Sequence, residues 1–325
     1  MNIYDIAEKA GVSIATVSRV INNSGSVSSK TRRRVTDIIS QNNYIPGTNA
    51  RSGKIRGPVG VICSPRNRQL ILPLLQSLER INIFPEVIFC DDDRLNLKKN
   101  LDRLSELNAG FVIMDGYNLA GNEQRSGMIH DFAAKIPVIM LGAFIDCPGI
   151  YCIACPEQAL IADITLSYIK KGITEILFLF SSLNFGCTEI LQSYRSAFVT
   201  GGLSDDCGRA HLCPSGFDEA YAYVSELSAS GKLPGLIIAS DDELAAGVLK
   251  ATVSSGINVP QQLEIIGIGN TSISKYCNPE LSTIDCHTDK ICEQAVSVLS
   301  ALMHKSTAPT RTVLNPVLIK KGTTL

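Results

Sequence analysis

Residues 11–22 read GVSIATVSRVIN, and this stretch decides the fold of the N-terminal part of the chain. Gly11 ends a preceding helical pattern, and Ser13 is of the residue type that caps a new helix. Val17 and Val20 then recur at the spacing of the buried face of a helix. We therefore expect two short helices joined by a tight turn, the arrangement called helix-turn-helix.

Further helical patterns lie on both sides of this segment. One covers residues 3–10, and the other begins at Ser28 or Ser29 and ends near residue 42. Serine is a good N-cap because its hydroxyl accepts an unpaired amide of the first helical turn. Three short helices around one small core are therefore expected in residues 1–45.

Positive charge is concentrated at the same end of the chain. Residues 1–57 hold nine Lys and Arg against three Asp and Glu, a net charge of +6, whereas the remainder carries −7 and the whole chain −1. Phosphate attraction supplies most of the non-specific affinity of proteins for DNA. This distribution predicts that only the N-terminal part meets a polyanion.

The second helix carries side chains suited to reading bases. A recognition helix places its first turn against base edges in the major groove. Arg19 would bind a guanine through two hydrogen bonds, and Ile14 or Ala15 would contact a thymine methyl group. The sequence therefore favours a DNA-binding headpiece.

The body, residues 58–325, alternates apolar strand-like runs with amphipathic helical patterns. The expected strands are 59–63, 86–90, 111–114, 138–141, 176–180, 236–239 and 264–268, and the expected helices include 70–81, 95–107, 158–171 and 243–255. This alternation predicts parallel sheets flanked by helices, an α/β fold. The body is long for a single sheet, so we expect two similar lobes around a cleft.

Matching positions in fixed register make the chain similar to the LacI/GalR family of bacterial transcription regulators. They are residues 3–7, 11–22, 27–28, 31–32 and 44–46 in the headpiece and, among others, 137–138, 172, 240–247, 256–260 and 279–284 in the body. The resemblance implies a periplasmic-binding-protein-like body whose chain crosses between the lobes near residues 155, 285 and 312. It also implies a repressor whose affinity for DNA is controlled by a small effector.

The same resemblance implies which headpiece residues contact DNA. Ile14, Ala15 and Arg19 would read bases. Tyr4, Ser13, Thr16, Ser18, Asn22 and Tyr44 would lie at or near the DNA backbone. The DNA partner would be a near-palindromic double-stranded operator, because the default assembly is a homodimer without the C-terminal leucine heptads that build tetramers.

A hinge linker is expected at residues 46–57. Ala50 and Arg51 match the most recognisable pair of the family's hinge and are further candidates for DNA contact. Gly53 stands where the family usually has a leucine that enters the minor groove as an apolar wedge. Glycine has no side chain to insert, so Ile55 is the alternative wedge if the register shifts.

Six candidate effector-binding residues lie just beyond predicted strand ends, where open parallel sheets bind ligands. They are Arg66, Arg68, Tyr117, Phe144, Asp241 and Asn270. The resemblance implies a sugar or sugar phosphate as the effector, and Gly269-Asn270-Thr271 is similar to the trehalose-6-phosphate-responsive branch. Arg66 and Arg68 would bind a phosphate. Ile190 stands where the family usually has an arginine, so a different sugar pose is expected.

Patterns for an enzyme or a metal site are incomplete. Gly267-Ile268-Gly269 begins like a dinucleotide-binding loop, but Ser272 occupies the place of the third glycine. Cys152 and Cys155 form one CxxC without a second pair of ligands. We expect no catalysis, no cofactor and no metal. A small-molecule binding protein without a role on DNA remains the alternative, and the headpiece argues against it.

The chemistry of the cysteines and the apolar runs indicates a cytoplasmic protein. The 11 cysteines are an odd number spread through apolar segments, which suits reduced core thiols better than a disulfide framework. No apolar run reaches the length of about 18 residues that a membrane helix needs, and the start lacks the order of a secretory signal. We therefore expect no membrane partner.

Overall fold

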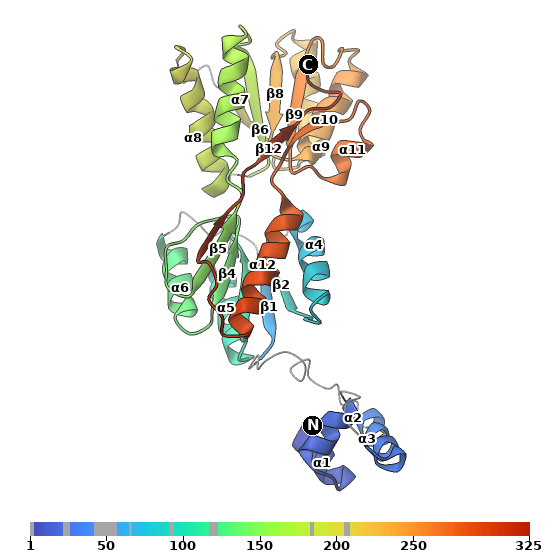
Figure 1. The fold of residues 1–325 in the computed structure, drawn as a ribbon. Helices are drawn as coiled ribbons and strands as arrows, with labels where there is room; N and C mark the ends of the chain where they lie inside the picture. The colour runs from blue at the N-terminus through green and yellow to red at the C-terminus, as the bar shows by residue number, and fades with distance from the viewer. Residues whose placement is uncertain are drawn as a thin grey trace.

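The computed structural model describes residues 3–21, 27–41, 57–64, 67–90, 94–116, 123–182, 185–204 and 209–325. It has a three-helix headpiece and a body of two lobes, each with one six-stranded sheet (Figure 1). The α/β fold with a helix-turn-helix and parallel sheets, expected from the sequence, is confirmed. The expected hinge, including Gly53 and Ile55, lies outside the described residues.

The headpiece consists of α1 (Ile3–Ala10), α2 (Ile14–Ile21) and α3 (Ser29–Gln41). Its core is formed by Ile6, Ala7, Ala10, Val17, Val20 and Val35. The Ser13 hydroxyl accepts the amide of Thr16 at 3.2 Å, and the Ser28 hydroxyl accepts the amide of Thr31 at 3.2 Å. Both serines therefore cap helices, and Ser28 rather than Ser29 is the cap of α3.

The first lobe has a fully parallel sheet in the order β11-β5-β4-β3-β1-β2. Its strands are β1 (Val59–Cys63), β2 (Glu86–Phe89), β3 (Phe111–Asp115), β4 (Val138–Leu141), β5 (Ile150–Ala154) and β11 (Arg311–Val313). Its helices are α4 (Arg68–Glu79), α5 (Arg94–Glu106), α6 (Glu123–Ala133) and α12 (Thr288–Met303). The helix α12, from the C-terminal part of the chain, packs against α4, β4 and β5.

The second lobe has a sheet in the order β12-β10-β9-β8-β6-β7, parallel except for the β10/β12 pair. Its strands are β6 (Ile176–Phe180), β7 (Arg209–Leu212), β8 (Leu236–Ala239), β9 (Glu264–Ile268), β10 (Ser282–Asp285) and β12 (Val317–Ile319). Its helices are α7 (Gln158–Lys170), α8 (Phe185–Thr200), α9 (Phe217–Ala229), α10 (Asp242–Ser254) and α11 (Ser272–Tyr276).

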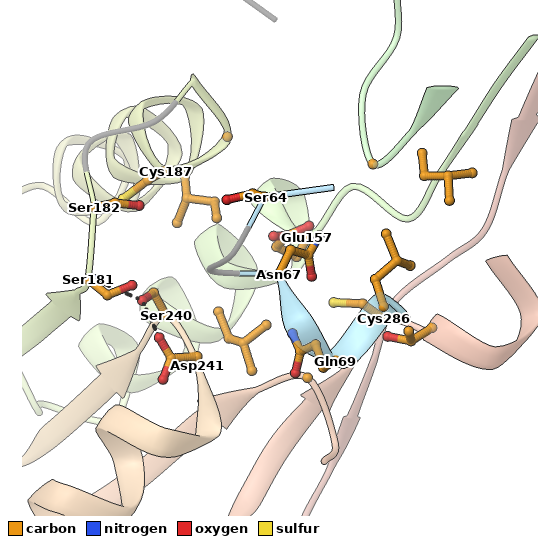
Figure 2. Close-up of a pocket in the computed structure, with 18 of the residues that line it drawn as sticks. Ser64, Asn67, Gln69, Glu157, Ser181, Ser182, Cys187, Ser240, Asp241 and Cys286 are labelled. Carbon is orange, nitrogen blue, oxygen red and sulfur yellow. Dashed lines mark hydrogen bonds between the residues drawn. The ribbon is translucent and has the colours of Figure 1, made fainter. Parts of the chain in front are cut away.

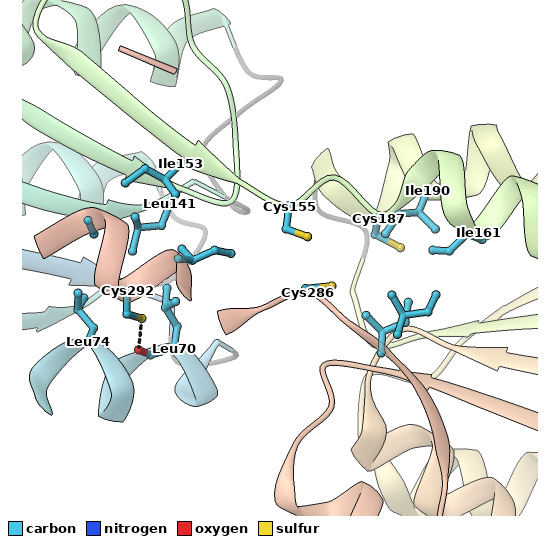
Figure 3. Close-up of a cluster of buried hydrophobic side chains, with 14 of the residues drawn as sticks. Leu70, Leu74, Leu141, Ile153, Cys155, Ile161, Cys187, Ile190, Cys286 and Cys292 are labelled. Carbon is cyan, nitrogen blue, oxygen red and sulfur yellow. Dashed lines mark hydrogen bonds between the residues drawn. The ribbon is translucent and has the colours of Figure 1, made fainter. Parts of the chain in front are cut away.

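Three chain segments join the lobes: β5 to α7, β10 to α12 and β11 to β12 (Figure 1). They lie at the crossings expected near residues 155, 285 and 312. Cys155 follows β5, Cys286 follows β10, and their sulfur atoms face each other where the two halves of the body meet (Figure 3). Neither lobe is therefore one continuous stretch of sequence.

Several element boundaries differ from the sequence prediction by one or two residues, and two of them show why. Helix α4 begins at Arg68, whereas the apolar pattern starts at Leu70, because Gln69 in the first turn is exposed and carries no apolar signal. Strand β3 extends to Asp115, whose buried carboxylate accepts the amide of Ser64 at 3.3 Å. The apolar pattern therefore does not detect polar residues at the ends of helices and strands.

Ten cysteines lie in the described part of the chain, and nine of them are buried. Within the ranges given above, no helix has the length and apolar character needed to span a bilayer. Nor do those residues gather three or more His, Cys, Asp or Glu side chains that could hold a metal ion.

Candidate functional site

The candidate DNA-contacting face lies on α2. Ile14, at its first turn, is 40% exposed. Arg19 and Ser13 are exposed, and Thr16 is half-buried and pairs its hydroxyl with that of Ser13 at 2.9 Å. An apolar group and a guanidinium are thus available on the same short helix, as reading base edges requires.

Other predicted DNA-contacting residues have no described side chain. Tyr4 lies in α1, and Ala15 and Ser18 lie in α2, but their side chains are outside the described part of the structure. Asn22, Tyr44, Ala50 and Arg51 lie outside the described residues. For all of them the DNA contact stays a prediction.

A cavity of about 160 Å³ lies between the two lobes, and side chains from both lobes line it (Figure 2). Most of its wall follows the carboxyl ends of parallel strands. Ser64 follows β1, Gly142 follows β4, Ser181 follows β6, Ser240 follows β8 and Gly269 follows β9. This is the place where open parallel sheets bind ligands.

Helix α10 orients the carboxyl group of Asp241 at the cavity wall. Asp241 is the N-cap of α10, and its Oδ1 accepts the amide of Leu244 at 2.8 Å. The Ser240 hydroxyl donates to Asp241 Oδ2 at 3.3 Å and accepts the amide of Ser181 at 3.3 Å. Small polar groups from two adjacent strands are thus held in fixed positions.

Glu157 is the most buried acid at the cavity. It lies between β5 and α7, lines the wall and is only 6% exposed. Burial raises its pKa to about 7, the nearby carboxyl of Glu189 acts in the same direction, and a hydrogen bond from its own backbone amide opposes them. This acid therefore changes charge near neutral pH.

Two cysteine thiols also line the cavity. Burial raises the pKa of Cys187 to about 12, and a hydrogen bond with Cys155 together with burial raises the pKa of Cys286. Only the thiolate is an effective nucleophile. These thiols therefore act as small, weakly polar wall groups.

Part of the wall is aliphatic and is formed by Leu70, Leu141, Ile190, Ile268 and Ile291. Ile190 lies on α8 and is 5% exposed. It stands where the family usually has an arginine, so the wall has an apolar group at this position. A wall of apolar surface with a few placed polar groups is typical of small-molecule sites.

The candidate effector residues have different positions in the structure. Asp241 lines the cavity. Phe144 lies under the guanidinium of Arg311, 4.0 Å from its ring centre, and is not among the described cavity residues. Asn270 is adjacent to the wall residue Gly269 and donates its amide to Thr283 Oγ1 at 3.1 Å.

Arg66 and Tyr117 lie outside the described residues, and Arg68 opens α4 without a described side chain. The prediction did not include several wall residues, namely Ser64, Asn67, Gln69, Glu157, Ser181, Ser182, Ser240, Cys187, Cys286 and Thr288. Ser64, Ser181 and Ser240 follow strand ends, so the rule used for Asp241 would have found them. Glu157 and Gln69 do not directly follow a strand and gave no such signal.

Comparison with known proteins relates both parts of the chain to described families. Residues 2–47 match the model of bacterial regulatory proteins of the lacI family, and residues 167–324 match a periplasmic binding protein-like domain. An HTH-type transcriptional regulator of Lachnoclostridium phytofermentans is 30% identical, over 100% of this chain and 99% of the relative. The ribose operon repressor of Escherichia coli is 27% identical, over 98% of each chain.

A solved structure has the same fold over the full length. The lac repressor dimer bound to operator and an anti-inducer superposes with a TM-score of 0.75 at 21% identity, covering 100% of this chain and 99% of the repressor. The headpiece match also decides against a binding protein without a role on DNA. The chain belongs to the lacI family of bacterial regulatory proteins and is a DNA-binding transcription regulator.

Proposed function

We propose that this regulator binds a sugar or sugar phosphate in the cavity between its lobes, and that the ligand changes the affinity of the headpiece for an operator. One observation carries the proposal: the cavity wall is shared by both lobes, with Ser64 and Gln69 on one side and Ser240 and Asp241 on the other. A ligand held by both lobes favours the relative arrangement of lobes that it fits best. If the headpieces also bind the operator more tightly in one arrangement of the lobes than in another, the ligand changes operator affinity. This difference couples the cavity to the distant DNA site.

The names of relatives support the class of ligand. One relative is a ribose operon repressor, and a solved neighbour in fold is the lac repressor dimer bound to operator. From these relatives we infer a homodimer, a near-palindromic double-stranded operator and repression of transcription by operator binding. Because the target is DNA, we place the protein in the cytoplasm, and we propose no catalytic activity.

The division of labour follows the sequence prediction. Residues 1–45 bind DNA, residues 46–57 form the hinge, and residues 58–325 bind the effector and dimerise. Ile14, Ala15 and Arg19 read bases, and the exposure of Ile14 and Arg19 supports that role. A twofold dimer places two headpieces on half-sites about one helical turn apart.

Selection from random double-stranded DNA by the full-length protein tests this function. The expected product is a palindrome, and its affinity should change when a sugar or sugar phosphate is added. Anisotropy of the labelled operator measures the change for each compound. Recovery of unrelated or asymmetric sequences would contradict operator recognition, and an affinity that no compound of these classes alters would contradict the proposed effector.

A further inference from the structure

Glu157 is a buried acid at the wall of the cavity between the lobes. It stands at the first crossing between the lobes, is more than nine-tenths buried and contributes to the cavity wall. Figure 2 shows its carboxyl among the side chains that surround the cavity. Although Glu157 is the N-cap residue of α7, its side chain makes no capping hydrogen bond. Helix capping therefore does not account for an acid at this position.

The Glu157 carboxyl has no cationic or side-chain partner within the described chain. Its one hydrogen bond comes from its own backbone amide. The neighbouring Glu189 does have a partner, because it accepts a hydrogen bond from Gln158 Nε2 at 3.0 Å. A buried charge costs free energy unless it is paired. Glu157 therefore has unused capacity to bind a cation.

The carboxyl of Glu189 on α8 makes the charged form of Glu157 less favourable still. The other titratable groups near Glu157 are the thiols of Cys187 on α8 and Cys286 after β10, whose pKa values are raised. Cys155, which follows β5, forms a hydrogen bond with Cys286. Asp241 adds another carboxyl group at the cavity. Among the described residues that line the cavity, none is a lysine, arginine or histidine. The described wall therefore favours a ligand that brings positive charge.

The rest of the wall fits a hydroxylated carbon frame. Hydroxyl and amide groups are supplied by Ser64, Asn67, Gln69, Ser181, Ser182, Ser240 and Thr288. Each of them can donate and accept hydrogen bonds, as a ligand hydroxyl also does. Ile190 and Ile268 offer apolar surface for the C–H groups of the same ligand.

We propose that the effector is a hydroxylated molecule carrying one protonated amine, of the amino sugar class, and that Glu157 binds its ammonium group. The inference rests on the proposed function, in that the cavity is taken as the effector site. An ammonium ion against this carboxyl supplies the missing partner and stabilises the carboxylate. Binding therefore releases a proton from Glu157 wherever the empty site holds one, and affinity rises with pH until the amine of the free ligand begins to lose its own proton.

Calorimetry on the full-length protein tests this inference. The probes are the 2-amino-2-deoxy hexoses of the gluco, galacto and manno series, each measured beside its parent hexose, its N-acetyl derivative and the parent 6-phosphate. We expect one amino sugar to bind about tenfold or more tightly than its uncharged counterparts, the scale of one hydrogen bond to a charged group. Measurement in two buffers of different ionisation enthalpy should show proton release at about pH 6. At about pH 8 Glu157 is already ionised and the free amine is partly deprotonated, so binding the ammonium form should instead take up protons.

Two substitutions identify the group responsible. Glu157→Gln keeps the shape and removes the charge, so it should abolish the preference for the amine and the proton release. Glu189→Gln removes a carboxyl that does not line the cavity, and it should keep the preference for the amine. Its proton release should be reduced but not abolished, because burial rather than Glu189 is the larger cause of the raised pKa of Glu157. Thermal unfolding and operator binding verify that each variant is folded. A preference for the amine that survives in Glu157→Gln overturns the assignment of Glu157.

The outcomes separate this inference from the proposed function. If a neutral or phosphorylated hexose binds as tightly as the amino sugar or more tightly, and alters operator affinity, the proposed function stands and the amine inference fails. If no compound of the panel binds, charged or neutral, both fail for this class of ligand.

Discussion

A single acid at the crossing between the lobes gives the protein a sensitivity to pH. Burial raises the folded-state pKa of Glu157 from 4.5 to about 7, so the folded protein holds this proton more tightly than the unfolded chain does. Between these two values the folded form binds more protons, and its stability therefore falls as pH rises. Below this window Glu157 is protonated in both states, and the stabilising contribution of its protonated form in the fold is fully present. Above the window Glu157 is ionised in both states, and this contribution to the free energy of unfolding is lost.

Replacement of Glu157 by glutamine should remove this loss of stability. We expect the difference in unfolding free energy between Glu157→Gln and the wild type to grow in favour of the variant from about pH 5 to about pH 8, by at most about 3 kcal/mol. Urea unfolding of the full-length proteins at several pH values measures it. Parallel pH profiles for the two proteins would contradict the raised pKa.

Replacement of Arg19 by alanine should relax the choice of one base in each half-site. Loss of a bidentate contact with guanine costs about 1 to 3 kcal/mol on the preferred sequence and little on others. Arg34→Ala, which removes the same charge from an exposed position on α3, should weaken binding evenly on all sequences. Selection from random DNA compares the two. An even loss for Arg19→Ala would make this arginine a phosphate contact.

The rule that ligands bind beyond the ends of parallel strands predicted Asp241 but missed other residues of the cavity wall. Asp241 was predicted because it follows a strand end, and it lines the cavity. Serines at equivalent places carry no distinctive signal, since serine is common in loops. Glu157 could not be recognised because its burial depends on packing between segments that are far apart in the sequence.

Helix caps decide where the elements of the headpiece begin. The Ser28 hydroxyl accepts the amide of Thr31, whereas Ser29 is already the first residue of α3. We expect Ser28→Ala to destabilise the first turn of α3 by about 1 kcal/mol and Ser29→Ala to have a much smaller effect. Hydrogen exchange of the α3 amides in the full-length protein measures both. Equal protection in the two variants would contradict the assignment of the cap.

The long apolar strands were predictable because each buried face leaves a run of apolar residues. Five strands of the body were not predicted. Strand β5 is apolar and mostly buried and was missed although it has such a run, whereas the other four gave weaker signals. Strands β11 and β12 have three residues each, too few for a pattern. Strand β10 is buried yet rich in hydroxyls: Thr283 donates to Asp242 Oδ1 at 2.6 Å, and the Ser282 hydroxyl lies 2.8 Å from that of Thr324. Strand β7, at the edge of its sheet, begins with Arg209 and contains His211.

The whole molecule contains cores that are separate in the headpiece and in the body. The headpiece core contains only residues of α1, α2 and α3, and none of them belongs to the core clusters of the two lobes. We therefore expect residues 58–325 alone to remain folded, dimeric and able to bind the effector. Analytical ultracentrifugation and calorimetry on this fragment measure these properties. Aggregation, or a monomer at micromolar concentration, would contradict the proposed division of labour.

The triple crossing between the lobes also limits how such a gene can be recombined. Each lobe is assembled from stretches separated by parts of the other: α12 and β11 return to the first lobe before β12 completes the sheet of the second. One genetic exchange transfers a contiguous stretch, so it can give a headpiece a new body but cannot replace one lobe alone. New ligand specificity should therefore reach an existing headpiece either as a complete body or through point mutations at the cavity.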